Sequence, residues 1–342
     1  MSNKPNVGIV AYGMYIPETF MTAADLSKAT KGVWSEQAII EKLGINKKPI
    51  PGGPGDGTQE IGVKAGLDCL KRFNYDPMKI DVILCIGEEW KEYPLTTSGV
   101  YIQEQIGARN AWAIDVQQKC CSCIGAMKMA KDMLVADDDI KSIMIVGGYR
   151  NCDFLNYEDP ISSLMFDLAA GGAAMIMEKN ATKNLVLGSH LVADGTLARG
   201  CMLPVGGTAE PVNRENVDRA YDIKFTDIEY YKKRLTEVSI PNWFTCIDQA
   251  LKKSGLTKKD IDYLNILHIK PTMHKSILDS LGLSENQSTY LNDYGHVGQC
   301  DQVLSLDLGI QSGKIKDGTI MAIIAAGIGY VWAASIVKWG PA

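Results

Sequence analysis

The chain of 342 residues is 46% hydrophobic, so it can bury a large core, either in two domains or in one large fused sheet sandwich. Its net charge is −5 and no basic run has interleaved aromatic residues, so nucleic acid is excluded as an expected partner. No apolar signal region opens the chain and no run approaches the ~20 apolar residues of a membrane span, so we expect no membrane partner. Its nine cysteines, an odd number, indicate reduced thiols and a cytoplasmic protein.

Strand-like and helix-like segments alternate along the chain. The first half has strand-like runs at 8–12, 82–86, 143–146 and 173–177, and helix-like runs at 59–73 and 97–106. The second half has helix-like runs at 243–254, 274–281 and 303–311 and a strand-like run at 320–326. This alternation predicts βαβ units and sheets covered by helices. We expect the polar, poorly periodic stretch 204–232 to be a surface excursion that shapes a substrate entrance.

Two pairs of segments recur in the same order, which predicts that the chain consists of two similar halves. Segment 75–85 resembles segment 256–268. Segment 115–148 follows the same plan as segment 293–332, in which a turn leads into an apolar helix, a charged turn and a strand that ends in glycines.

In this alignment, reactive side chains occupy equivalent positions of the two halves. Cys85 corresponds to His268, and Cys120 corresponds to His296. Strand ends and helix starts are the usual places for reactive groups in a layered α/β fold, so we expect a site where the two halves meet.

Four short motifs, spread over nearly the whole chain, carry a family resemblance. Residues 7–17 form an apolar run that ends in Tyr-Ile-Pro, and residues 115–120 read Asp-Val-Gln-Gln-Lys-Cys. Residues 192–196 read Val-Ala-Asp-Gly-Thr, and the tail 294–332 runs from Tyr-Gly-His to Gly-Ile-Gly-Tyr-Val-Trp. In register, these motifs resemble the opening strand, the Asp-x-x-x-x-Cys approach to the nucleophile, the His-Ala-Asp-Gly-Ser segment and the C-terminal tail of the thiolase superfamily. The resemblance is closest to its ketoacyl synthase III branch.

This resemblance implies an α/β protein with the thiolase fold, a duplicated five-layer α-β-α-β-α sandwich, that forms a homodimer. With the seam near 180–184, we expect an N-terminal half, 1–182, that carries the nucleophilic cysteine. The C-terminal half, 183–342, then carries the two histidines of the site.

Three cysteines, Cys120, Cys121 and Cys123, crowd one turn. Counting five residues from Asp115, as the family pattern does, selects Cys120 as the nucleophile. Cys123 is the alternative, because Cys-Ile-Gly resembles the family's Cys-x-Gly. The dipole and free N–H groups at the start of a buried helix favour a thiolate, which suits attack on a thioester. The separated Cys-x-x-Cys pairs of a zinc site are missing, so we expect no metal.

The resemblance implies that His268 is the family's first catalytic histidine, although residues 269–271 replace the usual Gln-Ala-Asn after it. His296 stands where the synthase III branch has asparagine, so the set Cys-His-His resembles the elongating ketoacyl synthases instead. Neutral imidazoles at both positions can donate to a thioester oxygen as it becomes an enolate, which a decarboxylating Claisen condensation requires. We expect His190 to be structural and His274 to be a surface or packing residue.

The glycine-rich tail completes the expected site. Gly327, Ile328 and Gly329 follow the last core strand. The resemblance implies that the backbone N–H groups of Ile328 and Cys120 hold the acyl carbonyl oxygen, with Gly327 and Gly329 beside the substrate.

The resemblance also assigns two aromatic side chains to substrate binding. Tyr93 falls where the family places an aromatic that crosses the dimer interface and closes the partner's acyl pocket. Trp34 corresponds to the family's adenine-stacking tryptophan, but the accompanying arginines are absent, and the nearest cations are Lys42, Lys47 and Lys48. We expect acyl-CoA or acyl carrier protein thioesters as substrates and no bound cofactor, since no Gly-x-Gly-x-x-Gly opens a helix.

The sequence therefore predicts an acyltransferase of fatty acid or polyketide biosynthesis. It loads an acyl group onto Cys120 and condenses it with a malonyl-type extender to a β-ketoacyl product. One alternative is non-decarboxylative acyl transfer or condensation of the hydroxymethylglutaryl-CoA synthase kind. The other is a catalytically silent subunit of a hetero-oligomer, which the replaced segment after His268 and the missing arginines allow.

Overall fold

The computed structural model describes residues 4–342, in which strands and helices alternate as expected. The strands of the main sheet are β1 (Val7–Tyr15), β4 (Val82–Cys85), β5 (Trp112–Asp115), β6 (Ser142–Tyr149), β7 (Gly171–Lys179), β8 (Lys183–Ala193), β11 (Tyr263–Ile266), β12 (Ile320–Gly327) and β13 (Val331–Pro341). Two small hairpins pair β2 (Phe20–Thr22) with β3 (Lys47–Pro49) and β9 (Cys201–Met202) with β10 (Lys224–Phe225). The α-helices are α1 (Ala23–Ala29), α2 (Glu36–Ala38), α3 (Thr58–Phe73), α4 (Ser98–Gln105), α5 (Ser122–Ala136), α6 (Ile228–Ser254), α7 (Pro271–Leu281) and α8 (Asp301–Gln311).

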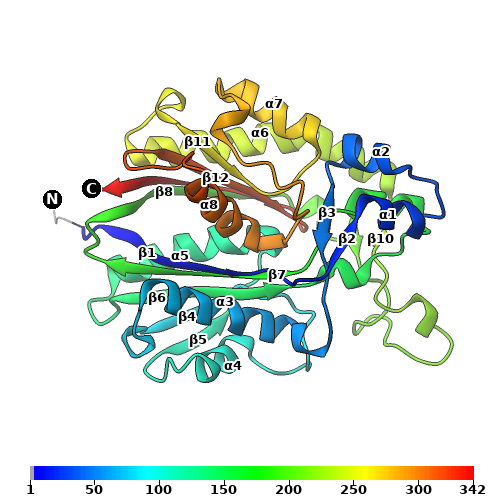
Figure 1. The fold of residues 1–342 in the computed structure, drawn as a ribbon, viewed down its shortest axis with the longest axis horizontal. Helices are drawn as coiled ribbons and strands as arrows, with labels where there is room; N and C mark the ends of the chain where they lie inside the picture. The colour runs from blue at the N-terminus through cyan, green and yellow to red at the C-terminus, as the bar shows by residue number, and fades with distance from the viewer. Residues whose placement is uncertain (1–3) are drawn as a thin grey trace.

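The main sheet has the strand order β11-β12-β13-β8-β1-β7-β6-β4-β5. A single residue pair, Gly8 with Leu185, joins β1 to β8 and so divides the sheet into two parts. Helices α5 and α8 lie between these parts, α3 and α4 cover the outer face of one, and α6 and α7 cover the outer face of the other (Figure 1). These five layers are the expected α-β-α-β-α sandwich of an α/β protein.

The inner helices bring two turns of the chain together. The first turns of α5, which consist of small and apolar residues, are buried. Nearly all of α8 is buried too, including its polar residues Asp301, Gln302 and Asp307. The turn Lys119–Cys121 leads into α5, the turn Gly298–Cys300 leads into α8, and these two turns lie against each other. The free N–H groups at both helix starts therefore meet in the interior.

The two parts of the sheet repeat one topology, which confirms the expected duplication. In the first part, β4 pairs parallel with β6, β6 pairs antiparallel with β7, and β7 pairs antiparallel with β1. In the second part, β11, β12, β13 and β8 pair with the same directions and in the same order.

The register of this repeat differs from the expected one. Cys85 ends β4 and corresponds to Ile266, the end of β11, so pairing it with His268 was wrong by two residues. Cys120 lies in the turn before α5 and corresponds to Gln299, so pairing it with His296 was wrong by three. Both histidines lie in loops, outside the helices and strands that the two halves share. An alignment of motifs does not distinguish loop residues from residues of the repeated elements.

The seam between the halves remains a proposal. β7 ends at Lys179 and β8 begins at Lys183, and the sheet changes from its first part to its second between them. We therefore propose 1–182 and 183–342 as the two units.

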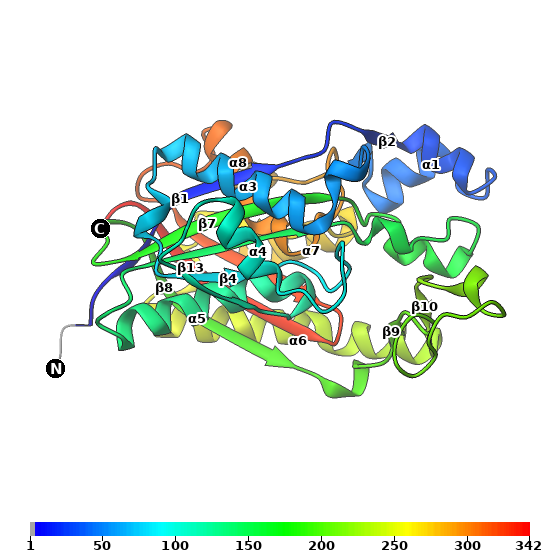
Figure 2. The ribbon, with the colours of Figure 1, turned by 90° about the horizontal axis from the view of Figure 1, so that it is seen from below.

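Two excursions gather at the end of the molecule opposite both termini (Figures 1 and 2). The β2–β3 hairpin, with α1 and α2, packs around its own cluster of Leu26, Ile39 and Phe166. The second excursion runs from β9 to β10, and α6 begins directly after it, at Ile228 rather than at the expected 243. The first turns of α6 are polar and Pro241 interrupts their apolar pattern, so the sequence showed only the apolar C-terminal part of this helix.

Candidate active site

Cys120 lies in the turn before α5 and is 7% exposed. Of the three neighbouring cysteines it alone lines a cavity, whereas Cys121 and Cys123 are fully buried in the core. The Sγ of Cys121 lies 3.3 Å from the carbonyl oxygen of Val331, which accounts for its orientation away from the cavity. The fold thus presents one of three adjacent thiols at a helix start, where the dipole favours a thiolate.

His296 contacts this sulfur directly. Its Nε2 lies 3.0 Å from the Sγ of Cys120, and its Nδ1 lies 2.6 Å from Oδ2 of Asp301. Burial lowers the pKa of His296, but the charges of Cys120 and Asp301, together with its hydrogen bonds to both, outweigh burial and raise it well above the usual range. An imidazole held between a cysteine sulfur and a carboxylate can exchange a proton with that sulfur, as covalent catalysis by a cysteine requires.

Asp301, the first residue of α8, is fully buried and holds this arrangement together. Its carboxylate accepts the backbone N–H groups of Val297, at 2.7 Å, and of His268, at 2.8 Å, besides the ring of His296. One side chain therefore fixes both histidine-bearing loops. Sequence reasoning missed it, although an aspartate at the start of an apolar helix, five residues after a histidine, was a usable signal.

His268 lies in the same cavity wall but does not contact Cys120. Its ring is buried, with Nδ1 at 2.9 Å from Oδ2 of Asp167 and Nε2 at 3.1 Å from the carbonyl oxygen of Gly44. Both partners are hydrogen-bond acceptors, and together they engage both nitrogens of the ring. Burial raises the pKa of Asp167, but the hydrogen bond to His268, the charges of both histidines and that of Lys48 hold it below its usual value.

Lys48, one of the cations expected near coenzyme A, is a structural residue instead. Its ammonium is fully buried and donates to the carbonyl oxygens of Phe166 and Leu168, both at 2.7 Å. These two residues flank Asp167, so Lys48 fixes the backbone on both sides of it. Burial lowers the pKa of Lys48 to about 8. The loop that it holds also bonds His296 through the backbone, with His296 N–H donating to the Asp167 carbonyl oxygen at 2.7 Å.

Gly327, at the end of β12, lies against the turn that carries the nucleophile. A Cβ atom at this position would lie 2.5 Å from the carbonyl oxygen of Gln118 and 3.1 Å from the nitrogen of Cys120, so no larger residue fits without movement. This close approach places the 327–329 turn beside the N–H of Cys120, which lies in the first turn before α5 and has no helical acceptor.

Two cavities open beside Cys120. We call the first, of about 290 Å³, the thiol cavity; it is lined by Cys120, His268 and His296, with Trp243 and Tyr330 among its apolar walls. The second, of about 490 Å³, we call the side cavity; it contains Lys119, the chain neighbour of Cys120. Ile328 lines both cavities, so it stands between them, and Gly329 lines the side cavity.

The two expected aromatic binding residues line neither cavity of the single chain. Trp34 is half-buried against the cluster around Leu26 and Ile39. Tyr93 is 70% exposed in the loop between β4 and α4.

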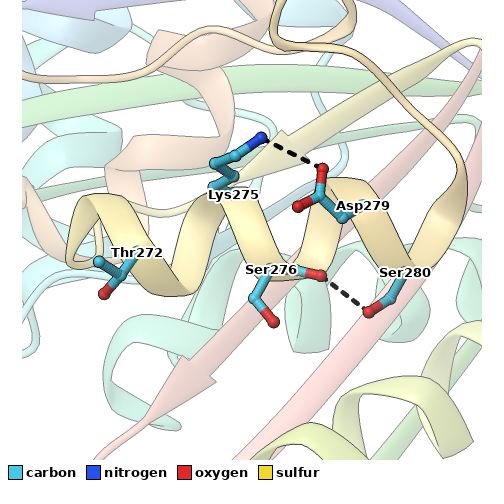
Figure 3. A pocket seen from close by; sticks show the side chains of 5 residues that line it. All are labelled: Thr272, Lys275, Ser276, Asp279 and Ser280. Carbon is cyan, nitrogen blue, oxygen red and sulfur yellow. Dashed lines mark hydrogen bonds and ion pairs between the residues drawn. The ribbon is translucent and has the colours of Figure 1, made fainter.

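A shallow depression elsewhere, on the outer face of α7, offers no reactive group (Figure 3). Its polar groups pair with each other along the helix, as in the ion pair of Lys275 with Asp279 at 3.3 Å and the bond from Ser280 to the Ser276 carbonyl oxygen at 2.7 Å. Within residues 4–342, no group of three or more histidine, cysteine or acidic side chains is placed to hold a metal ion. No helix in that range is long and apolar enough to cross a bilayer.

Comparison with known families and proteins places this site in context. Residues 114–195 match the model of 3-oxoacyl-(acyl-carrier-protein) synthase III, and residues 251–339 match the model of its C-terminal part. The two matches together span half of the chain. The chain belongs to the 3-oxoacyl-(acyl-carrier-protein) synthase III family. The expected membership in the thiolase superfamily is thereby confirmed, as is the prediction of a condensing acyltransferase.

Relatives of the synthase III family match along their whole length. The beta-ketoacyl-(acyl-carrier-protein) synthase III of Caldanaerobacter subterraneus subsp. tengcongensis is 26% identical over 99% of both chains. That of Prochlorococcus marinus is 28% identical over 99% of this chain and 98% of its own. Among solved structures, the synthase III of Thermus thermophilus superposes with a TM-score of 0.84 at 22% identity, covering 98% of this chain and 100% of that one. The priming beta-ketosynthase of the R1128 polyketide pathway superposes with a TM-score of 0.82 at 20% identity, covering 100% of this chain and 99% of that one. These superpositions confirm the thiolase fold.

Proposed function

We propose that the protein is a priming ketoacyl synthase in which Cys120 receives an acyl group and His296 and Asp301 activate it. The observation that carries this proposal is the line of contacts from the Cys120 sulfur through the His296 ring to the Asp301 carboxylate. A thiolate, its proton partner and an orienting carboxylate are the parts that covalent acyl transfer needs.

In the loading step, the Cys120 thiolate attacks the carbonyl carbon of an acyl thioester. The oxygen of the tetrahedral intermediate becomes negative and is held by the N–H groups of Cys120 and Ile328. The intermediate collapses by breaking its bond to the leaving sulfur, and His296 gives its proton to that thiolate. The acyl groups arrive as thioesters of coenzyme A or acyl carrier protein, and no further cofactor takes part.

In the condensing step, a malonyl-type thioester enters the thiol cavity. Loss of carbon dioxide leaves an enolate, whose carbon attacks the acyl carbonyl and expels the Cys120 thiolate. Having given its proton to the leaving thiolate, His296 takes up a proton from solvent, and with the sulfur acylated its Nε2 then donates to the enolate oxygen. His268 becomes the second donor when its Nε2 exchanges the Gly44 carbonyl oxygen for the extender.

The engagement of His268 favours a second candidate, acyl transfer to an acceptor that does not decarboxylate. In the structure, both nitrogens of this ring are already bonded, so only His296 faces the sulfur. Release of labelled carbon dioxide from malonyl thioesters distinguishes the two functions, since only condensation produces it.

The active assembly that we propose is a homodimer formed through β5. This strand is one of the two edges of the main sheet, and its Trp112 and Ile114 are about half exposed. Tyr93 and Leu95 are also exposed in the nearby loop, and such an apolar edge is a template for pairing with a second copy. Tyr93 then reaches the partner's acyl site, which explains why it lines no cavity of its own chain.

Mass spectrometry of the intact protein tests this function. We expect incubation with acyl-CoA thioesters to add one acyl mass, absent in Cys120→Ala and retained in Cys123→Ala. A protein that acquires no acyl mass from any thioester is the silent subunit of the alternative reading. All nine cysteines are free, which supports a reducing, cytoplasmic site for this chemistry.

A further inference from the structure

The side cavity lies next to the turn that carries Cys120. Lys119 precedes the nucleophile, and Ile328 separates the two cavities. Since Ile328 lines both cavities, an acyl chain on Cys120 that extends past this side chain enters the side cavity.

One wall of the side cavity is apolar. Phe154, Val205 and Ile223 are buried along it, and Trp90 packs on Phe154 and on Tyr221 with ring centroids 5.1 and 4.9 Å apart. A chain of methylene groups fits such a wall.

The remaining part of the lining is polar and rich in hydrogen-bond acceptors. Glu88 is 4% exposed, and the ammonium of Lys119 lies 3.5 Å from its carboxylate and 3.0 Å from that of Glu89. Asn151 also lines this cavity, and its Oδ1 is buried with no hydrogen-bond partner. Lys119 adopts a left-handed backbone conformation, with φ at 50°, which is rare for a side chain of this size.

The balance of these groups indicates the ligand. Two carboxylates and one unpaired amide oxygen accept hydrogen bonds, whereas the one ammonium is already shared between both carboxylates. An alkyl chain would cover these acceptors and leave them unmatched, and a carboxylate would meet an excess of negative charge. A hydroxyl or amino group would supply the missing donor.

We propose that the side cavity binds the acyl group on Cys120 and selects acyl groups that carry a hydrogen-bond donor, a hydroxyl or an amine, beyond the carbonyl. This inference rests on the proposed function, because it concerns the acyl group that the same cysteine receives. It adds the class of primer: ω-hydroxy- or ω-aminoacyl thioesters over plain alkyl thioesters of equal length.

The test compares four coenzyme A thioesters of equal chain length: hexanoyl, 6-hydroxyhexanoyl, 6-aminohexanoyl and adipyl. The initial rate of acyl addition to Cys120 is measured by intact mass. We expect the hydroxyl and amino compounds to load at least about tenfold faster than hexanoyl, because a site built for a donor rejects the analogue that lacks it. We expect adipyl to be slowest. Hexanoyl loading as fast as the other two would overturn the proposal.

Two variants test whether the polar side chains of the side cavity produce this preference for hydroxyl and amino groups. Asn151→Ala and Glu88→Gln are each expected to bring the hydroxyl-to-alkyl ratio close to one, whereas Ser276→Ala, in the α7 depression, keeps it. A ratio unchanged in both cavity variants would overturn the assignment to this wall. Circular dichroism checks their folding, and the wild-type comparison decides the matter if either fails to fold.

The proposed function fails in a different way from this inference. If no thioester loads, including acetyl-CoA, or if loading persists in Cys120→Ala, the nucleophile is wrong. If all four thioesters load on Cys120 at similar rates, the nucleophile is right and only the selectivity is wrong.

Discussion

At the scale of single residues, two carboxylates each hold a histidine: Asp301 is fully buried and Asp167 is partly buried. Asp301 bonds the ring that touches the nucleophile, and Asp167 bonds the ring that does not. Such a partner fixes the orientation of an imidazole and stabilises its charged form. The two histidines therefore have different partners before any substrate binds: His296 contacts the Cys120 sulfur, and His268 does not.

The role of Asp301 is tested by Asp301→Asn, which keeps the shape of the side chain and removes its charge. We expect acyl loading to slow by roughly 100-fold, because loss of an orienting partner typically costs 10- to 100-fold. The loading rate is measured by stopped flow. The reactivity of Cys120 is measured by its rate of alkylation with iodoacetamide between pH 5.5 and 9. Because the charge of Asp301 helps to raise the pKa of His296, the variant should lose alkylation rate most near neutral pH.

A matched control for this variant is Asp279→Asn, on the exposed face of α7. It should leave the loading rate and the pH dependence of alkylation unchanged. An Asp301→Asn protein that folds and loads at the wild-type rate would show that His296 needs no orienting partner.

The two histidines should separate by step. His296→Ala removes the proton partner of the sulfur, so loading should fall by about 100-fold or more, the usual contribution of acid–base catalysis. His268→Ala should load an acyl group at near the wild-type rate but release far less carbon dioxide from a malonyl thioester. Acyl mass and labelled carbon dioxide are measured on the same preparations. Normal loading by His296→Ala would instead limit that residue to the enolate.

At the scale of elements, α7 contains a titrating group that the catalytic mechanism does not use. His274 is 6% exposed and packs on Tyr290, and its Nδ1 has no hydrogen-bond partner. Burial first, and then the charges of His268 and Lys314, lower its pKa to about 4. His274 is therefore a packing residue, one of the two roles that we expected from the sequence. Its contact with Tyr290 joins α7 to the loop that contains Tyr290.

This histidine should make stability depend on pH. Between the unfolded pKa of ~6.5 and the folded value of about 4, the unfolded chain binds more protons, so stability falls as the pH falls through that window. The loss is on the order of 3 kcal/mol at most. Urea unfolding at pH 7 and pH 4.5 measures it, and His274→Gln should lose less between the two. An equal loss in both proteins would place the acid sensitivity elsewhere.

Also at this scale, two irregular excursions contribute residues to the candidate site. The excursion with α1, α2 and the turn Ile39–Leu43 delivers the Gly44 carbonyl oxygen to His268. The excursion between β9 and β10 supplies Val205 and Ile223 to the side cavity, as expected of an entrance-shaping segment in 204–232. Irregular segments of this kind have no periodicity by which to predict their contacts.

At the scale of the whole molecule, the proposed homodimer would cover the exposed edge of β5 and the exposed Tyr93. We expect Ile114→Lys to convert a dimer into a monomer in sedimentation velocity, because a charge on an apolar edge disfavours strand pairing.

Tyr93→Ala should leave the protein dimeric and shift loading toward longer or bulkier acyl groups. A monomeric wild type, or an unchanged chain-length profile in Tyr93→Ala, would contradict the role of the partner subunit.

The sequence by itself determined the fold class, the duplication and the family. Helix and strand periodicities repeat locally, and the motifs around 115–120 and 294–332 keep their order however the chain folds. The count from Asp115 also selected the one cysteine of three that the structure places in the cavity.

Only the tertiary structure decided which groups touch. Cys120 and His296 are 176 residues apart, and His268 and Asp167 are 101 apart, so their contacts depend on how the two parts of the sheet align around α5 and α8. The same alignment buried Lys48, which the sequence left as a candidate ligand for coenzyme A. Local patterns carry no record of such distances, because a loop of a few residues can direct a side chain to either side of a strand end.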